Sequence, residues 1–207
     1  MASSNNTEAR ERVLEAAERL FAERGYTAVT LRDIAAAVGI RHASLYHHAP
    51  GGKEELFVEV TERNLRRHQA GLEQSIRQAA PEVRARLHAA ADWLLSQPPM
   101  DLVRMIHSDM PAIDSEHAQR LTWLAYDTLL SPVERVLEDA RARGEIAHDT
   151  PALVAGGVIG LIESLHAVPA SVLEQSRVSM AHTLLDTLLH GLYPRSNSGL
   201  PAAETDF

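Results

Sequence analysis

Basic and imidazole side chains gather in one short stretch near the N-terminus. This stretch holds Arg32, Arg41, His42, His47 and His48, outside the apolar pattern of the helices around them. Guanidinium and imidazolium groups donate hydrogen bonds to phosphate oxygens, and arginine also pairs with the acceptor atoms of guanine in the major groove. These side chains have no use in a hydrophobic core. The stretch therefore indicates a contact with nucleic acid.

The charge distribution permits such a contact locally. The whole chain of 207 residues has a formal net charge of -8, which opposes binding to phosphate. Residues 1–53, however, carry seven Lys and Arg against six Asp and Glu, a net charge of +1. The acidic excess lies in residues 54–207. A DNA-binding segment at the N-terminus is therefore compatible with an acidic protein.

A second group of side chains offers ligands for a divalent metal ion. Imidazole and carboxylate groups suited to zinc follow one another at His107, Asp109, Asp114 and His117. Pro111 lies between the two halves of this set and leaves their geometry unspecified. Ordinary surface residues explain the pattern more simply. We therefore expect no metal site and keep this set as the weak alternative.

Large apolar side chains also gather in the central region. Both tryptophans lie there, in a chain with only 4% aromatic residues. Such side chains line apolar ligand pockets, but core packing uses the same residue types, and both interpretations stay open. His166 is expected to be a core histidine with satisfied hydrogen bonds. The candidate pocket residues are Trp93, Met105, Met110, Trp123 and Tyr126.

The sequence contains no motif for catalysis. It has no Gly-x-Ser-x-Gly elbow, no phosphate-binding glycine loop, no His-Glu-x-x-His pair and no cysteine. No apolar run is long enough to cross a bilayer, and the N-terminal residues are neither basic nor apolar, as a secretory signal would be. We therefore expect a cytoplasmic protein that is not an enzyme and has no cofactor.

The apolar pattern predicts helices and no strands. Stripes at helical spacing predict helices from about residue 7 to Gly25, from 30 to 38 and from 41 to 48. Thr30 and Asp33 form a capping-box pair at the start of the second helix, and Gly39 supplies the turn after it. Two short helices joined by a tight glycine turn form a helix-turn-helix.

The rest of the chain predicts a longer helical domain. After the breaker Ala49-Pro50-Gly51-Gly52 we expect a connector helix over about 53–78. Pro132 should kink or break a later helix, and glycines at 156, 157 and 160 suggest close approach of another backbone. The further helices are expected at about 81–97, 101–108, 115–143, 150–168 and 171–191.

A longer N-terminal pattern is specific to one family. It comprises Arg12-Val13-Leu14-Glu15-Ala16-Ala17, Leu20-Phe21-Ala22-Glu23-Arg24-Gly25-Tyr26, Thr30-Leu31-Arg32-Asp33-Ile34-Ala35, Val38-Gly39-Ile40, Ser44-Leu45-Tyr46 and Lys53-Glu54-Glu55-Leu56. The pattern resembles the amino-terminal signature of the TetR family of regulators, named for the tetracycline repressor. The remainder is similar to that family only in its layout, as a helical domain of the expected size.

The resemblance implies that ten residues contact DNA. His42, Ala43 and Ser44 would face base edges, and Arg41 would bind guanine through two hydrogen bonds. The others would hold phosphates or reach toward the backbone and groove. The complete set is Thr30, Arg32, Arg41, His42, Ala43, Ser44, Tyr46, His47, His48 and Lys53.

The sequence departs from that family in two places. Ala49 stands where the family usually has an aromatic residue, and one more residue than usual separates it from Lys53. Arg41 replaces the small hydroxyl residue common at the start of the recognition helix, so a helix cap is lost where a charge is gained. The reach of Lys53 and the preferred DNA sequence therefore do not transfer from the family.

These observations predict a two-part, all-α protein. Residues 7–53 are expected to form a three-helix helix-turn-helix domain, residues 54–194 a helical ligand-binding and dimerisation domain, and residues 195–207 a flexible tail. The resemblance implies a regulator, and specifically a repressor, that binds a palindromic operator in double-stranded DNA as a homodimer. A small-molecule effector would release it. The alternative is a helical ligand- or metal-binding dimer that has lost DNA binding.

Overall fold

Helices account for all the regular secondary structure of the described chain. The computed structural model describes residues 2–147 and 149–192, and these ranges contain helices joined by turns and no strand. The prediction of an all-α fold is confirmed. The predicted tail over residues 195–207 lies outside the described residues. No helix in the described ranges has both the length and the apolar character needed to cross a membrane.

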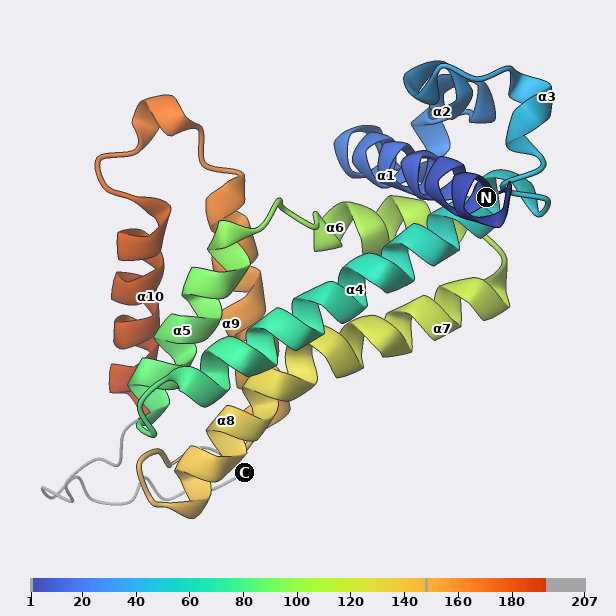
Figure 1. Ribbon diagram of the computed structural model, residues 1–207. Helices are drawn as coiled ribbons and strands as arrows, with labels where there is room; N and C mark the ends of the chain where they lie inside the picture. The colour runs from blue at the N-terminus through green and yellow to red at the C-terminus, as the bar shows by residue number, and fades with distance from the viewer. Residues whose placement is uncertain (1, 148, 193–207) are drawn as a thin grey trace, which may run out of the picture.

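Three helices form a head at one end of the molecule (Figure 1). They are α1 (Ala2–Ala28), α2 (Leu31–Val38) and α3 (His42–Leu45). The first was predicted to stop at Gly25. The helix is interrupted there, at φ 77° and ψ 168°, and the helical assignment then continues to Ala28. Glycine adopts this conformation far more readily than residues with a Cβ atom.

The helix-turn-helix follows the local signals in the sequence. Thr30 and Asp33 form the expected capping box: the Asp33 amide donates to Thr30 Oγ1 over 3.2 Å, and the Thr30 amide donates to Asp33 Oδ2 over 2.8 Å. Gly39 ends α2 in the left-handed conformation, at φ 76°. The third helix is shorter than expected, because helical structure ends at Leu45 and residues 46–48 form a turn.

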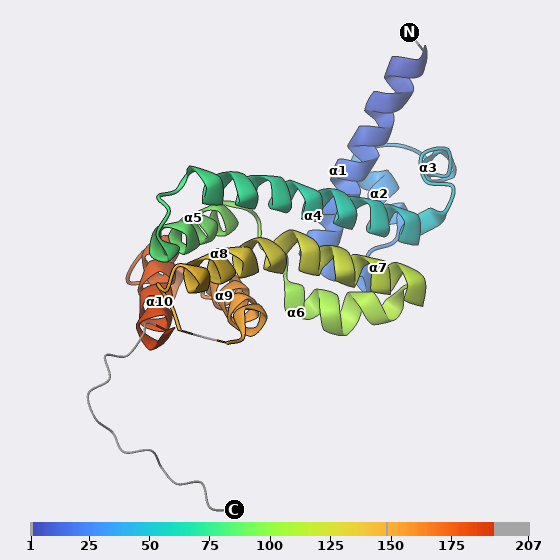
Figure 2. The same cartoon turned by 90° about the horizontal axis from the view of Figure 1, so that it is seen from below.

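The body of the molecule is built along α4 (Gly52–Gln78), which runs from the head to the far end (Figure 1). Figure 2 shows α7 and α8 running along the same direction as α4, with α5, α9 and α10 gathered at the end away from the head. The bounds of the body helices are α5 (Val83–Ser96), α6 (Leu102–Arg104), η1 (Met105–Asp109), η2 (Met110–Ala112), α7 (Ser115–Ala125), η3 (Tyr126–Leu130), α8 (Ser131–Ala142), α9 (Pro151–His166), η4 (Ala170–Val172) and α10 (Arg177–Leu192).

Two hydrophobic cores hold the described residues together, and α4 contributes to both. The first joins the head to the near half of α4, through residues such as Leu45, Leu56 and Leu65, and also includes Met105 and Leu121 from the body. The second packs the far half of α4 against α5, α8, α9 and α10. Apolar packing therefore continues across the predicted domain boundary at residue 53, which stays a prediction.

The chain remains helical through Pro132. The proline lies in the first turn of α8, and η3 directly before it is a π-helical turn, in which the Ser131 amide bonds to the Tyr126 carbonyl. Proline lacks an amide proton and crowds the preceding turn, and a wider turn relieves both problems. The predicted kink or break therefore takes the form of a local change in helix type.

Candidate nucleic-acid interface

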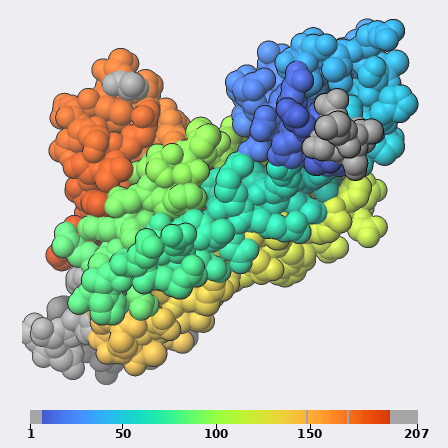
Figure 3. All heavy atoms as spheres, viewed as in Figure 1, coloured from blue at the N-terminus to red at the C-terminus, as the bar shows by residue number. Residues whose placement is uncertain are grey.

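The residues expected to contact DNA lie on α2, on α3 and on the segments that flank α3. Figure 3 shows this part of the head as the outer end of the molecule, away from α9 and α10. The exposed members of the set are Thr30, Arg32, Arg41, Ala43, Tyr46 and His47, and the half-buried members are His42, Ser44, His48 and Lys53. Nine of these residues therefore lie on the helix-turn-helix and the turn after α3, and Lys53 lies at the start of α4.

A buried framework holds this surface in place. Leu45 and Ala49 are inaccessible to solvent, at 0% and 1% exposure, and they anchor α3 and the turn after it to the core of the head. Ala49 therefore packs inside the head, although the family that this sequence resembles usually has an aromatic side chain at that position. Its neighbours His47 and Tyr46 point outward, and the Tyr46 ring is 48% exposed. Anchoring the small helix on one side leaves its other side free to enter a groove.

The start of α3 bears out the expected loss of a cap. Arg41 occupies the N-cap position with φ -69° and ψ 141°, and its side chain makes no capping hydrogen bond. The guanidinium group therefore does not cap the N-terminus of α3, and the side chain is exposed. His42 and Tyr46 lie one turn apart, with ring centroids 5.4 Å apart in an edge-to-face arrangement. This contact orients the Tyr46 ring on the outer surface.

Two members of the set already have partners inside the protein. Lys53 Nζ donates to the carbonyl of Tyr26 over 3.0 Å and lies 4.1 Å from the centre of the Tyr26 ring. It thus ties the start of α4 to the end of α1, and a phosphate could use only its remaining protons. The hydroxyl of Thr30 likewise donates to Asp33 over 2.7 Å, and this bond lowers the pKa of the Asp33 carboxyl. Both phosphate contacts stay predictions.

The five candidate pocket residues do not all come together, although the Trp123 and Tyr126 rings meet edge to face with centroids 6.4 Å apart. Trp93 packs on Gly71 of α4, beside the second core, whereas Met105 and Met110 are buried in the first core. Trp123 is 63% exposed, and Tyr126 donates its hydroxyl proton to Glu134 over 2.7 Å. Trp93 and Met105 pack against different cores. The assignment of these five residues to one ligand pocket stays a prediction, because it depends on helix rotations that the sequence does not specify.

The four candidate metal ligands also take part in different contacts. His107 is exposed, Asp109 is buried against the head, and Asp114 caps α7 by accepting from the Glu116 amide. His117 bonds through Nδ1 to Glu54 over 2.7 Å. No group of three or more potential ligands lies close enough to hold a metal ion within residues 2–147 and 149–192.

The sequence did not reveal that Asp109 and Arg104 connect the body to the head. Asp109 is 4% exposed and accepts a hydrogen bond from the Tyr26 amide over 2.8 Å. Arg104 donates to the carbonyls of Phe21 and Ala22, over 3.2 and 2.8 Å. We call these two residues and their three contacts on α1 the Arg104 clamp. Nothing in the local sequence around Arg104 marks it for this role.

Gly25 fits against this clamp. A Cβ atom at this position would lie 3.1 Å from Asp109 Oδ1 and 3.2 Å from Cδ of Arg104. The backbone break at Gly25 also turns the Tyr26 amide toward Asp109, while the carbonyls before it face Arg104. The interrupted end of α1 is therefore held from both sides by the body.

A second link connects the body to the start of α4. One carboxylate oxygen of Glu54 accepts from the Asp114 amide over 3.0 Å and pairs with His117 Nδ1. These two hydrogen bonds hold the pKa of Glu54 below its usual value. The head is thus attached to the body at the end of α1 and at the start of α4. A movement of α6 or α7 would therefore reach α1 and α4, which share one hydrophobic core with the helix-turn-helix.

A comparison with known proteins finds a family model that matches the head and the start of α4. Residues 13–60 match the family model for bacterial regulatory proteins of the tetR family. The HTH-type transcriptional regulator LmrA of Bacillus subtilis is 46% identical over 53 residues, which cover 26% of this chain and 28% of LmrA. The chain thus matches less than a third of that relative.

Two further comparisons extend over most of the chain. The HTH-type transcriptional repressor AcnR of Corynebacterium diphtheriae is 26% identical over 199 residues, which cover 92% of this chain and 82% of AcnR. The crystal structure of PfmR, a TetR family transcriptional regulator from Thermus thermophilus, has a TM-score of 0.68 and 26% identity, covering 88% of this chain and 100% of PfmR. The similarity therefore includes the body as well as the head.

Proposed function

We propose that this chain, whose N-terminal domain belongs to the tetR family of bacterial regulatory proteins, is a transcriptional repressor that binds DNA as a homodimer and responds to a small molecule. The observation that carries the proposal is the exposed, basic outer surface of a helix-turn-helix within the segment that matches the family. In this proposal Arg41, His42 and Ser44 read bases. Tyr46 and His47 contact phosphates.

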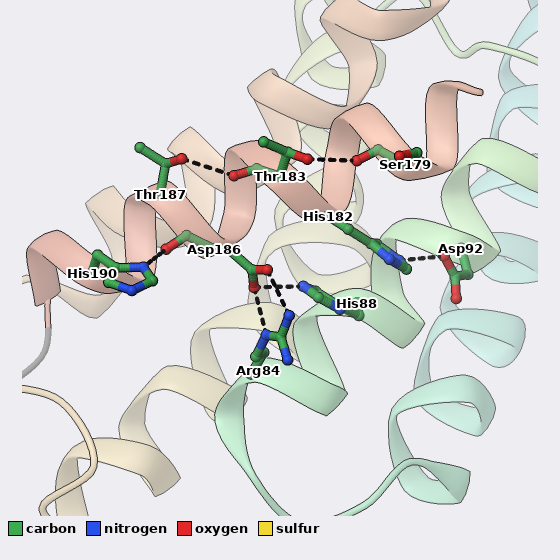
Figure 4. Close-up of polar contacts among 9 residues, drawn as sticks. All are labelled: Arg84, His88, Asp92, Ser179, His182, Thr183, Asp186, Thr187 and His190. Carbon is green, nitrogen blue, oxygen red and sulfur yellow. Dashed lines mark hydrogen bonds and ion pairs between the residues drawn. The ribbon is translucent and has the colours of Figure 1, made fainter. Parts of the chain in front are cut away.

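The dimer of the proposal forms through α9 and α10. One face of α10 is already bound to α5 in the same chain (Figure 4). Asp186 accepts from Arg84 Nε over 2.7 Å and lies 2.9 Å from His88 Nε2, and His182 Nε2 lies 2.7 Å from Asp92. The His88 and His182 rings stack with centroids 3.9 Å apart. This network fixes the orientation of α10 on the body.

The opposite face of α10 is exposed and carries both polar and apolar side chains. Thr183 and Thr187 point away from α5 in Figure 4 and bond to carbonyls of their own helix. Val178 and Leu184 on α10 are each 37% exposed, and Leu153 on α9 is 73% exposed. Large apolar side chains in exposed positions favour contact with another protein surface.

The glycines of α9 support the same interface. A Cβ atom added at Gly156 or Gly157 would meet no other atom within 4 Å; Gly160 is equally open but lines a cleft beside α6. The close backbone approach that these glycines suggest is therefore not made by another described helix of this chain. A second copy supplies it in the proposal, with α9 and α10 of each protomer forming a four-helix bundle about a twofold axis.

The twofold axis sets the form of the operator. Two recognition helices spaced about 34 to 36 Å apart enter successive major grooves, so the DNA site is a palindrome. A small molecule that binds better to a different spacing of the two heads shifts the dimer away from the DNA-bound arrangement. The clamp between α6 and α1 is the described contact through which the body would set the position of its head.

The test is selection of randomised duplex DNA by the purified protein at about 150 mM salt, followed by affinity measurements on the enriched site. We expect a palindrome to be enriched. Arg41→Ala should lower affinity for that site by about 10- to 100-fold, since a two-pronged contact to guanine contributes about 1 to 3 kcal/mol. Tyr46→Ala should weaken binding to specific and non-specific duplexes alike.

The matched control is Arg141→Ala, which removes an exposed arginine from α8 in the body. It should leave DNA affinity unchanged. Enrichment of no sequence, together with binding that does not depend on salt, would contradict the proposal. It would favour a helical binding protein without a DNA partner.

A further inference from the structure

An open cleft lies between the end of α1, the segment leading into α6, and the last turns of α9. Its volume is about 560 Å³, within the range of small-molecule sites. Figure 3 shows the molecule hollowed between the head and the α9 segment. We call this hollow the α6 cleft; its walls include Ala22, Pro99, Leu102, Val103, Arg104 and Glu163. The five candidate pocket residues from the sequence take no part in it.

The walls of the α6 cleft are mostly apolar. Val103 is 71% exposed, which is unusual for a large aliphatic side chain on a folded surface. Pro99 and Leu102 extend this apolar wall along α6, and Ala22 continues it onto α1. An occupant with an apolar body would cover these side chains and gain free energy from the area that leaves water.

The polar groups in the cleft favour a positively charged occupant. Glu163 places a largely buried carboxyl among the apolar walls, and this carboxyl accepts a hydrogen bond from the Met100 backbone. Burial and the nearby charge of Asp101 raise the pKa of this carboxyl. Asp101 itself lies at the entrance with a left-handed backbone, at φ 46°. A cation beside these two groups would remove their mutual repulsion.

The arginine in the wall pairs with Asp101 and has no ion pair with Glu163 among the described contacts. The guanidinium of Arg104 is already bonded to the Phe21 and Ala22 carbonyls, and it lies 3.4 Å from Asp101 and 3.6 Å from Asp109. Nη2 of Arg104 holds the end of α1, and its Nε is buried away from the cleft. An anionic occupant would therefore find no free cationic partner in the described wall of the cleft.

Ser164 and His166 are the other polar residues of the wall, and the Ser164 hydroxyl already donates to the Leu161 carbonyl over 2.7 Å. Burial lowers the pKa of His166, and a hydrogen bond connects its ring to the Leu94 backbone. Its Nε2 atom is buried and has no partner among the described residues. The expectation of a fully satisfied core histidine was therefore wrong for one of its two nitrogens. An occupant that donates a hydrogen bond suits this atom, and one that only accepts does not.

We propose that the α6 cleft binds a small molecule with an apolar body and an ammonium group, with the ammonium placed beside Glu163 and the body against Val103 and Leu102. This inference names the effector class of the proposed regulator and rests on that function only for its effect on DNA. Binding itself depends on the cleft alone.

The cleft also explains how such a molecule would act. Arg104 forms part of the cleft wall and belongs to the clamp on α1, and Ala22 is shared in the same way. An ammonium group near Asp101 competes with Arg104 for that carboxylate, which lies 3.4 Å from the guanidinium. The loss of this partner frees Arg104 to shift. The carbonyls at the end of α1 would move with it.

The experiment measures binding to the full chain by calorimetry, without DNA. The probes are hexylammonium, hexanoate and hexan-1-ol, which share an apolar body and differ in charge; hexylammonium also carries N–H donors. We expect the ammonium compound to bind the wild-type protein most tightly. Glu163→Gln should weaken that binding by about tenfold or more, because it removes a charge-assisted contact while preserving shape. Glu174→Gln, at an exposed position outside the cleft, is the control.

Several outcomes would overturn the inference. Tighter binding of hexanoate or hexan-1-ol to the wild type would exclude the ammonium class, and this comparison depends on no variant. Unchanged ammonium binding by a folded Glu163→Gln protein would exclude the site. In a second assay, the ammonium compound should release a selected operator from the wild type and fail to do so at the same concentration for the variant. A protein that binds no DNA would contradict the proposed function yet leave the calorimetric result intact.

Discussion

Burial of His68 should make the stability of this protein fall as the solution becomes mildly acidic. The side chain lies on α4, between the two ends of the molecule, and is 3% exposed. Its Nδ1 atom has no hydrogen-bond partner among the described residues. Burial, with a smaller contribution from Arg67, lowers the pKa of His68 from 6.5 to about 4. The folded protein therefore holds this ring neutral.

The direction of the effect follows from where protons bind. Below pH 6.5 the unfolded chain takes up a proton at this histidine, while the folded protein resists protonation until about pH 4. The contribution of the neutral His68 to the free energy of unfolding is therefore complete above pH 6.5 and is lost as the pH falls toward 4. At 1.36 kcal/mol per pH unit, the total loss is about 3 kcal/mol, of which about 2 kcal/mol has occurred at pH 5.

Urea denaturation of the wild type and of His68→Leu, each at pH 7.5 and at pH 5.0, measures this contribution. Other groups titrate in both proteins, so the quantity of interest is the difference between their pH dependences. We expect the wild type to lose about 2 kcal/mol more than His68→Leu between the two pH values. His47→Gln, at an exposed position on the head, is the matched control. Equal losses in the wild type and in His68→Leu would refute the reasoning.

Three further substitutions test local features by urea denaturation. Gly25→Ala should destabilise the protein by about 1 to 3 kcal/mol, because φ is 77° and the new Cβ atom would lie 3.1 Å from Asp109; an unchanged midpoint would contradict this. Thr30→Ala should cost about 1 kcal/mol through loss of the capping box, with Thr30→Ser as a nearly neutral control. Gly71→Ala would place its Cβ 2.0 Å from the Trp93 ring, and should cost about 1 to 3 kcal/mol and alter tryptophan fluorescence.

The head was predictable in detail because its signals are local. A capping box at Thr30 and Asp33 and a left-handed turn at Gly39 each depend on residues a few positions apart. The stripe that buries Leu45 likewise needs only helical spacing. The family resemblance then added DNA-contacting roles that no periodicity supplies. The same reasoning overestimated the length of the third helix, because the chain leaves it after one turn to bury Ala49.

The body was predictable as a set of helices but its sites were not. Trp123 looked like a pocket residue from its type, yet it is 63% exposed, whereas the cleft is lined in part by small and aliphatic side chains such as Ala22 and Val103. Asp109 was considered as a weak candidate metal ligand, whereas in the structure it accepts a hydrogen bond from the Tyr26 amide. Residue type therefore indicated the possible chemistry without indicating the partner.

The amino-acid pattern was sufficient to predict the helical regions, the capping box of α2 and the resemblance of the head to a family. These features depend on contacts within about one helical turn. The clamp and the cleft required the folded chain. Asp109 meets Tyr26, and Glu163 meets the backbone of Met100, across long separations in sequence. Such contacts depend on how each helix is rotated about its axis and where it crosses its neighbours. Those quantities are set by side-chain packing over the whole molecule, which spacing along the chain does not encode.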